Sequence, residues 1–244
     1  MFVRANDLRN LPGDVPAYFF RRTISTITMS YDQYQMQPQA PQGMGSRLTP
    51  FVRETYRLFL FGLLGMGGIG VLSYKFMPPI GAGVAWLLNA IMWIAVGWFH
   101  WRRPTRVVLP LFTIITGAWL GVLAHIYAAV FAPALILTLG AFGGLTAYAH
   151  TTRKDFSFLG GFLSMAFWVI LLGIVVQFIF PLPLLHLAIS AFGVLAMGGW
   201  VLYDTSRLLQ DNGDRMTPGE AAAELLLDIV GLFQWILSLL NRFR

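Results

Sequence analysis

The amino-acid sequence predicts an all-α membrane protein with seven transmembrane helices. Of the 244 residues, 57% are hydrophobic and only 11% are charged, whereas globular domains are roughly 45–50% apolar and about 25% charged. From Phe51 onward, apolar runs follow one another, and each is close to the roughly 20 residues that a helix needs to cross a bilayer. Because a segment in lipid must satisfy its own backbone hydrogen bonds, these runs are predicted to be helices.

The predicted spans end where prolines or charged residues interrupt the apolar runs. Arg102-Arg103-Pro104 ends the second span, and Pro181-Leu182-Pro183 ends the fifth. Ala132-Pro133 is interpreted as the turn between the third and fourth spans. The seventh begins at Pro218-Gly219-Glu220, with proline at the helix start and acids in the first turns. The predicted spans are residues 52–75, 81–101, 107–127, 131–151, 157–180, 184–208 and 220–241.

The first fifty residues have a different composition from the rest. Residues 1–50 are polar and rich in Gln, Pro and Gly towards their end, so we expect a disordered segment before a membrane domain at 51–244. No apolar core follows Arg4, and no signal peptide is predicted. A start at Met29 is an alternative to Met1.

The remaining composition argues against several other functions. The net charge is +6, but the basic residues are scattered between apolar runs, which is typical of membrane-flanking loops and not of nucleic-acid binding. The sequence contains no cysteine, so no thiolate metal site or cysteine nucleophile is available. The four histidines do not have the spacing of a helical zinc motif. We expect no enzymatic activity and no bound cofactor.

Several glycines within the spans are predicted to permit close helix packing. The run from Gly65 to Gly70 matches the dinucleotide pattern GxGxxG, but it lies inside the first span, where small residues usually mark helix contacts. The pairs Gly117/Gly121 and Gly140/Gly144 have the same GxxxG spacing, so we expect them to pack in the same way.

Two carboxylates lie inside predicted spans, and both are candidate functional groups. Most acids after Glu54, including Asp211, fall in loops, where solvation is the expected role. Asp204 ends an apolar run in the sixth span, and Asp228 lies within the seventh. An intramembrane carboxylate costs roughly 2.5 kcal/mol or more, so its presence indicates a function.

The spacing of these two residues places them at similar depth. Asp204 precedes the loop between the sixth and seventh spans by about 5 residues, and Asp228 follows it by about 8, which gives depths of roughly 8 and 12 Å. Facing carboxyls in an apolar site are expected to share one proton and to act as a pH-sensitive contact. In the alternative, Asp204 reaches interfacial water alone and Asp228 favours the start of its helix.

Glu224 lies one turn before Asp228 on the same predicted helix face. The two acids form a stripe that leads from the cytoplasmic end towards Asp228. Such a stripe is expected either to attract cations, including Ca²⁺, or only to offset the helix dipole.

Three segments together resemble the Bax inhibitor-1 family, also called the transmembrane BAX inhibitor motif or YccA family. They are Phe142-Gly-Gly-Leu-Thr-Ala-Tyr-Ala149 with Lys154-Asp155-Phe156-Ser157-Phe158-Leu159, then Leu202-Tyr203-Asp204-Thr205, then Glu224-Leu-Leu-Leu-Asp228-Ile-Val-Gly-Leu-Phe233. The resemblance covers residues from about 50 to 241 and identifies the chain as similar to bacterial members.

The resemblance implies a fold and two kinds of function. In the implied fold, the last helix is central and six others surround it. It implies a pH-dependent calcium leak in the inner membrane, in which paired aspartates matching Asp204 and Asp228 share a proton, gate a pore near the cytoplasmic face and offer a position for Ca²⁺. Some members are instead non-conducting modulators of a membrane protease or of cell-death pathways.

Three positions depart from the bacterial channel pattern. Where those members carry a glutamate within helix two and an arginine at its end, ungapped alignment places Asn89 and His100. His100 would pair with Asp204 only when it is protonated, whereas Arg102 and Arg103 are nearby alternatives that are always charged. Glu224 replaces a more usual small polar residue and is expected to line the ion path with Asn89.

The distribution of Lys and Arg predicts the orientation in the membrane. The loops after the second, fourth and sixth spans carry basic residues, and those after the third and fifth carry none. The positive-inside rule therefore places the N-terminus and the aspartate pair at the cytoplasmic side. Reporter fusions after Arg103 and after Asp211 are expected to read cytoplasmic, and a fusion after Pro181 periplasmic. A periplasmic signal after Arg103 would reverse this orientation.

Overall fold

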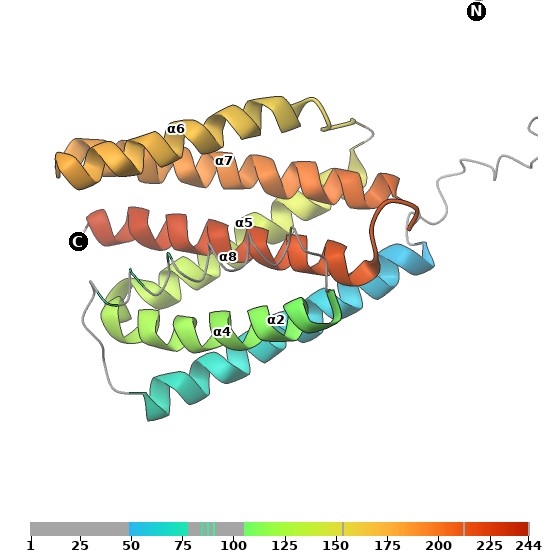
Figure 1. The fold of residues 1–244 in the computed structure, drawn as a ribbon, viewed down its shortest axis with the longest axis horizontal. Coiled ribbons are helices and arrows are strands. Elements are labelled where there is room, and N and C mark those ends of the chain that lie inside the picture. Colours follow the sequence, from blue (N-terminus) through green and yellow to red (C-terminus); the bar gives the residue numbers. More distant parts are fainter. Residues whose placement is uncertain are drawn as a thin grey trace, which may run out of the picture. The chain divides into compact units, whose positions relative to one another are not determined.

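The computed structural model describes residues 49–77, 84, 87, 90, 105–152, 154–211 and 213–243. In this part of the chain, each of six helices is long and apolar enough to cross a membrane. The described chain is thus that of a multi-pass helical membrane protein. The helices are α2 (Pro50–Phe76), α4 (Thr105–Ile126), α5 (Ala128–Thr151), α6 (Leu159–Ile179), α7 (Pro183–Gln210) and α8 (Pro218–Arg242) (Figure 1).

These bounds agree closely with six of the seven predicted spans. The predicted second span, residues 81–101, lies almost wholly outside the described residues, so the seventh helix stays a prediction. The polar segment at residues 1–48 also lies outside them.

The turn between α4 and α5 is shorter than predicted. Tyr127 alone separates the two helices, and its carbonyl accepts the backbone N–H groups of Val130 and Phe131 at 3.0 and 2.9 Å. Pro133 lies inside α5, so the prediction of a turn at Ala132-Pro133 is wrong. Proline is tolerated within membrane helices because neighbouring groups satisfy the freed carbonyl.

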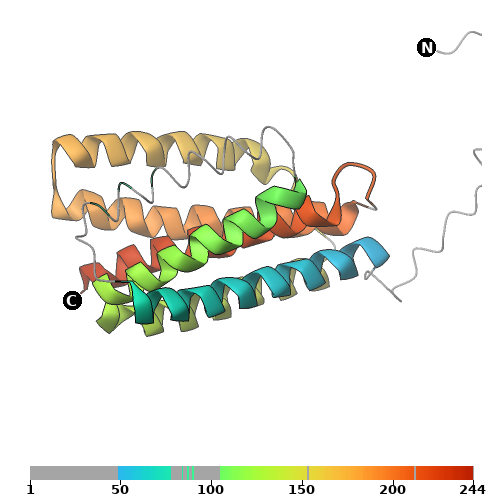
Figure 2. The same ribbon diagram turned by 60° about the horizontal axis from the view of Figure 1, so that its bottom comes forward.

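Helix α8 occupies the interior of the described bundle. It packs against α2, α4, α5 and α7, and it runs between α7 on one side and α4 and α2 on the other (Figure 1). In its most apolar stretch 61% of residues are buried, compared with 11% in α6. Helix α6 lies at the edge beside α7 in both ribbon views (Figure 2). Asp228, a buried polar side chain on α8, is therefore held away from lipid.

Small residues bring α2 and α4 close together, as the glycine spacing predicts. A Cβ atom added at Gly121 would lie 2.6 Å from the carbonyl oxygen of Gly70, and one at Gly117 would lie 2.9 Å from that of Met66. The Ser73 hydroxyl donates to the Ala118 carbonyl at 2.7 Å across this contact. In contrast, a Cβ at Gly140 or Gly144 would meet no atom of the described residues, so the same packing is not found there.

The α7–α8 connection is a tight turn around the side chain of Asp211. Its Oδ1 accepts the backbone N–H groups of Gly213, Asp214 and Arg215 at 3.0 to 3.3 Å, and its Oδ2 accepts that of Met216 at 3.1 Å. The prediction of a solvated loop acid is wrong here, because Asp211 is buried. Gly213 has a φ of 94°, a conformation that glycine adopts without strain.

The N-terminus of α8 is fixed immediately after this turn. The Thr217 hydroxyl accepts the backbone N–H of Glu220 at 3.3 Å, and the Glu220 carboxylate accepts the backbone N–H of Thr217 at 2.7 Å. This reciprocal capping satisfies two donors that the helix start leaves free. The turn and the cap together hold the C-terminal end of α7 and the N-terminal end of α8 side by side.

We expect Asp211→Ala to destabilise the protein in detergent by about 1–3 kcal/mol, since four backbone N–H groups lose a charged acceptor. Burial alone would raise the pKa of Asp211, but the N–H groups of Arg215, Gly213, Asp214 and Met216 hold it below its ordinary value. The stabilisation is therefore complete above the unfolded pKa of roughly 4 and is lost as the pH falls through the lower folded pKa.

Thermal unfolding in detergent at several pH values measures this effect. Asp214→Asn is the matched control, because Asp214 belongs to the same turn and has an exposed side chain. Equal melting temperatures for Asp211→Ala and Asp214→Asn would contradict the assigned role.

Candidate functional site

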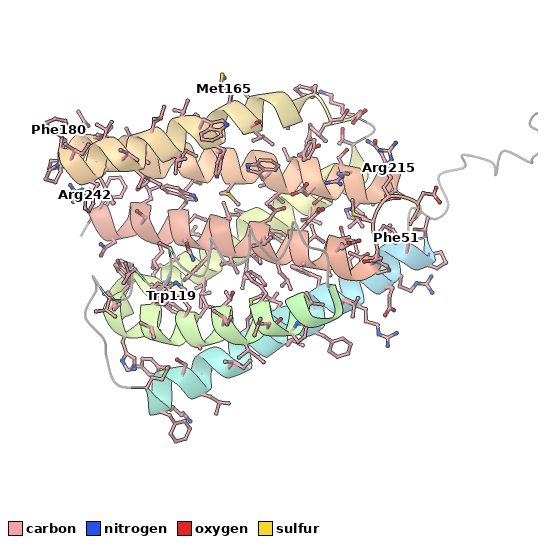
Figure 3. All side chains as sticks on the ribbon, viewed as in Figure 1. Phe51, Trp119, Met165, Phe180, Arg215 and Arg242 are labelled. Carbon is pink, nitrogen blue, oxygen red and sulfur yellow. The ribbon has the colours of Figure 1, made fainter. Side chains whose placement is uncertain are left out.

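The antiparallel helices α7 and α8 meet along a continuous seam. Towards the end that carries Arg242, the hydroxyls of Ser190 and Ser238 lie 2.9 Å apart. Further along, a Cβ at Gly193 would overlap the Trp235 ring, and one at Gly231 would lie 2.5 Å from the Met197 methyl group. Arg215 and Phe51 mark one end of the bundle, and Arg242 and Phe180 mark the other (Figure 3).

Asp204 and Asp228 face one another in this seam. Asp228 is only 5% exposed, and its carboxyl lies within reach of that of Asp204. No N–H or hydroxyl group of the described residues reaches Oδ2 of Asp228. Ionised carboxylates only accept hydrogen bonds, so this contact requires a proton on one of the two groups.

Glu224 and Arg207 form a second contact, towards the end of the seam that carries Arg215. Nη1 of Arg207 lies 3.5 Å from Oε1 of Glu224, and the two side chains are 41% and 15% exposed. Arg207 follows Asp204 by one turn on α7, and Glu224 precedes Asp228 by one turn on α8. Charged groups of both signs therefore lie next to the carboxyl pair on its aqueous side.

Sequence reasoning missed Arg207 as a cation beside the pair. Arg207 lies at the predicted end of the sixth span, residues 184–208, next to the loop. Its three-residue spacing from Asp204 places both on one helix face, and this was the available signal. His100, Arg102 and Arg103, the cations predicted for this role, and Asn89, predicted for the ion path, all lie outside the described residues.

No group of three or more metal-ligating side chains comes together within residues 49–77, 105–152, 154–211 and 213–243 or at the described positions between them. A position for Ca²⁺ at Asp204 and Asp228 accordingly stays a prediction.

The described histidines connect helices. Nδ1–H of His150 donates to the Thr146 carbonyl at 2.9 Å, which leaves Nε2 of the neutral ring to accept the Tyr56 hydroxyl at 3.3 Å. Nε2–H of His125 donates to the Tyr74 carbonyl at 2.8 Å, and the two rings stack. Nε2 of His186 lies 3.2 Å from the Ser238 hydroxyl, at the end of the seam opposite to the carboxyl pair.

The α5–α6 loop contacts the C-terminal end of α7. Oδ1 of Asp155 accepts Nε2–H of Gln210 at 3.0 Å and the backbone N–H of Ser157 at 2.9 Å. The Gln210 side chain, with that N–H and the Ser157 hydroxyl, holds the pKa of Asp155 below its ordinary value. The Ser206 hydroxyl accepts both the Gln210 amide at 3.1 Å and the backbone N–H of Phe156 at 3.4 Å. The loop is thus attached to α7 within two turns of Asp204.

Comparisons with known proteins agree with this architecture. A family model described as "Inhibitor of apoptosis-promoting Bax1" matches residues 48–244. Bax inhibitor 1 of Schizosaccharomyces pombe is 29% identical to the chain over 246 residues, which covers 95% of this chain and 91% of the relative. A BI1-like protein of Arabidopsis thaliana is 35% identical over 238 residues, covering 88% and 90%.

A bacterial protein is also similar to this chain. The protein named "Modulator of FtsH protease YccA" in Escherichia coli is 36% identical over 146 residues, covering 57% of this chain and 66% of the relative. The family model spans all six described helices and both members of the carboxyl pair, so the chain belongs to the Bax inhibitor-1 family.

Proposed function

We propose that this protein is a pH-responsive cation leak pathway in which Asp204 and Asp228 form the proton-sensitive contact. The contact between the two carboxyls in the interior of the bundle carries the proposal. At acidic pH one shared proton holds them together. When this proton is lost, two like charges lie in a poorly solvated site, and the α7–α8 contact weakens.

The neighbouring charges make a cation the expected cargo. Once the pair has lost its proton, Asp204, Asp228 and Glu224 carry more negative charge than Arg207 offsets. Carboxylate oxygens are the ligands that hard cations such as Ca²⁺ prefer. A cation that enters from the cytoplasmic side would stabilise the separated carboxylates, and this links deprotonation to passage of the ion.

A second candidate function is regulation of a membrane protease without ion conduction. The name of the Escherichia coli relative supports it, because that protein is called a modulator of the FtsH protease. The polar segment at residues 1–50 would then provide a partner with a binding region outside the bilayer. In this case the carboxyl pair would set the packing of α7 and α8 without opening a path.

We expect Asp204→Asn and Asp228→Asn each to remove most of the pH dependence of Ca²⁺ flux in proteoliposomes between about pH 6 and pH 8. The double variant is expected to add little to either single variant, because the two groups titrate as one unit. Thr205→Ser, a small change beside Asp204, is the control for perturbation of α7.

Additive effects of the two single variants would show that the carboxylates act independently. Absence of flux in the folded wild-type protein at every pH would exclude the leak function. Binding of that same protein to a purified FtsH-type protease in detergent would then support the second candidate.

We also expect Arg207→Gln to shift the half-maximal pH of flux upward by about 0.5 to 1, because the pair retains its proton longer without the adjacent positive charge. Glu224→Gln is expected to shift it downward for the opposite reason. Arg57→Gln is the matched control, since Arg57 pairs with Glu54 at 3.3 Å on the exposed surface of α2. Equal shifts for Arg207→Gln and Arg57→Gln would contradict an effect specific to the seam.

A further inference from the structure

The segment from Lys154 to Leu159 is one of the motifs that carry the family resemblance, yet it contains neither member of the carboxyl pair. It lies outside the membrane-spanning helices, between the end of α5 and the start of α6. A solvent-exposed loop of this kind normally tolerates many sequences. The contacts that these residues make give a structural reason for this particular sequence.

The hydrogen bonds described between this segment and other helices end on one short stretch of α7. The side chain of Asp155 and the backbone N–H of Phe156 bind Gln210 and Ser206, respectively. At the start of α6, a Cβ added at Gly160 would lie 3.1 Å from the Tyr203 ring, so this position holds α6 against α7. Phe156 is buried and lies against the Tyr148 ring of α5.

The contacted residues share a face of α7 that differs from the face of the carboxyl pair. Tyr203, Ser206 and Gln210 are spaced by three and four residues, so they line up along one side of the helix. Asp204 and Arg207 belong to the side that faces α8, roughly 100° away around the axis. The last two turns of α7 are therefore held from two directions, by α8 and by the α5–α6 loop.

This arrangement restricts rotation of α7 about its own axis. Rotation by a fraction of a turn would carry the Asp204 carboxyl away from Asp228, and it would also break the contacts of Ser206 and Gln210 with the loop. Both contacts on the loop side are hydrogen bonds, and one of them has the ionised Asp155 as its acceptor, which makes it stronger than a neutral pair.

We infer that Asp155, Ser206 and Gln210 form a positioning clamp that sets the rotation of α7 and thereby the closed contact between Asp204 and Asp228. The inference rests on the proposed leak function, since it assigns to the clamp the control of that contact. Asp155 and Gln210 are positioning residues, because they act on the carboxyl pair through the orientation of the helix and do not touch a permeating ion.

Flux measured against pH gives the first test. Asp155→Ala and Gln210→Ala are each expected to raise Ca²⁺ flux about fivefold at acidic pH, where the wild type is closed, and to flatten the pH profile, as expected for loss of hydrogen bonds of this kind. Asp155→Asn, which keeps an acceptor for Gln210 and Ser157, is expected to retain most of the closed state. Lys154→Gln, at the adjacent exposed position, is the control and should match the wild type.

A cross-linking measurement tests the clamp without ion flux. The chain has no native cysteine, and Cγ of Met197 lies 3.8 Å from the position of a Cβ at Gly231. The double variant Met197→Cys/Gly231→Cys therefore places two thiols opposite one another across the seam, where oxidation can join them. Its oxidation rate in detergent reports the rotation of α7 against α8. Adding Asp155→Ala is expected to slow this rate severalfold, whereas adding Lys154→Gln should leave it unchanged.

The two measurements separate the clamp from the leak function. If the wild type shows no flux but Asp155→Ala slows cross-linking, the leak function fails and the clamp is retained. If flux responds to pH through Asp204 and Asp228 but Asp155→Ala changes neither the acidic flux nor the cross-linking rate, the clamp is overturned. A melting temperature for each variant shows that the compared proteins are folded.

Discussion

The central constraint in this protein is a carboxyl group buried inside an apolar helical bundle. Asp228 lies on α8, the helix that the other described helices surround, and it is almost inaccessible to solvent. A lone charge there would be costly, so the group needs either a proton or an opposing charge. Asp204 on α7 supplies a partner that satisfies Asp228 when a proton is shared. In the proposed function, the packing of α7 against α8 responds to the protonation of this pair.

Other interactions at the same end of the bundle hold α7 where this contact forms. The turn around Asp211 fixes the short connection between α7 and α8, and the capping of α8 by Thr217 and Glu220 fixes where that helix begins. Arg207 and Glu224 bring opposite charges together beside the pair. The α5–α6 loop contacts the other side of α7 through Asp155. Each interaction is local, but together they determine the orientation of one helix end.

The opposite end of the same seam is built differently. Ser190, Ser238 and His186 connect through hydroxyl and imidazole groups, and between them and the carboxyl pair the Trp235 ring lies against Gly193. Hydroxyl groups satisfy one another without a net charge, so this end can pack closely at any protonation state of the aspartates. In the proposed function, the response to pH therefore arises at the end of the seam that carries the carboxyl pair.

The sequence by itself determined the helical membrane class, the positions of the six described helices within a few residues, and the carboxyl pair as the unusual feature of the last two spans. These follow from apolar run length and from the cost of a charge in lipid, which are local properties. The break at Ala132-Pro133 was wrong, since neighbouring helices let Pro133 continue α5. The packing expected at Gly140 and Gly144 was not found in the described part of the bundle.

Only the tertiary structure decided which polar groups meet. The sequence predicts Asp211 to be a solvated loop acid. In the structure, the turn after α7 instead brings four backbone N–H groups within hydrogen-bond distance of its carboxylate. Arg207 became a neighbour of Glu224 because α7 and α8 are antiparallel and in one particular register. The contact of Asp155 with Gln210 joins residues 55 positions apart. The spacing of residues along one helix predicts which of them share a face. The element against which that face packs is decided by the packing of the whole bundle.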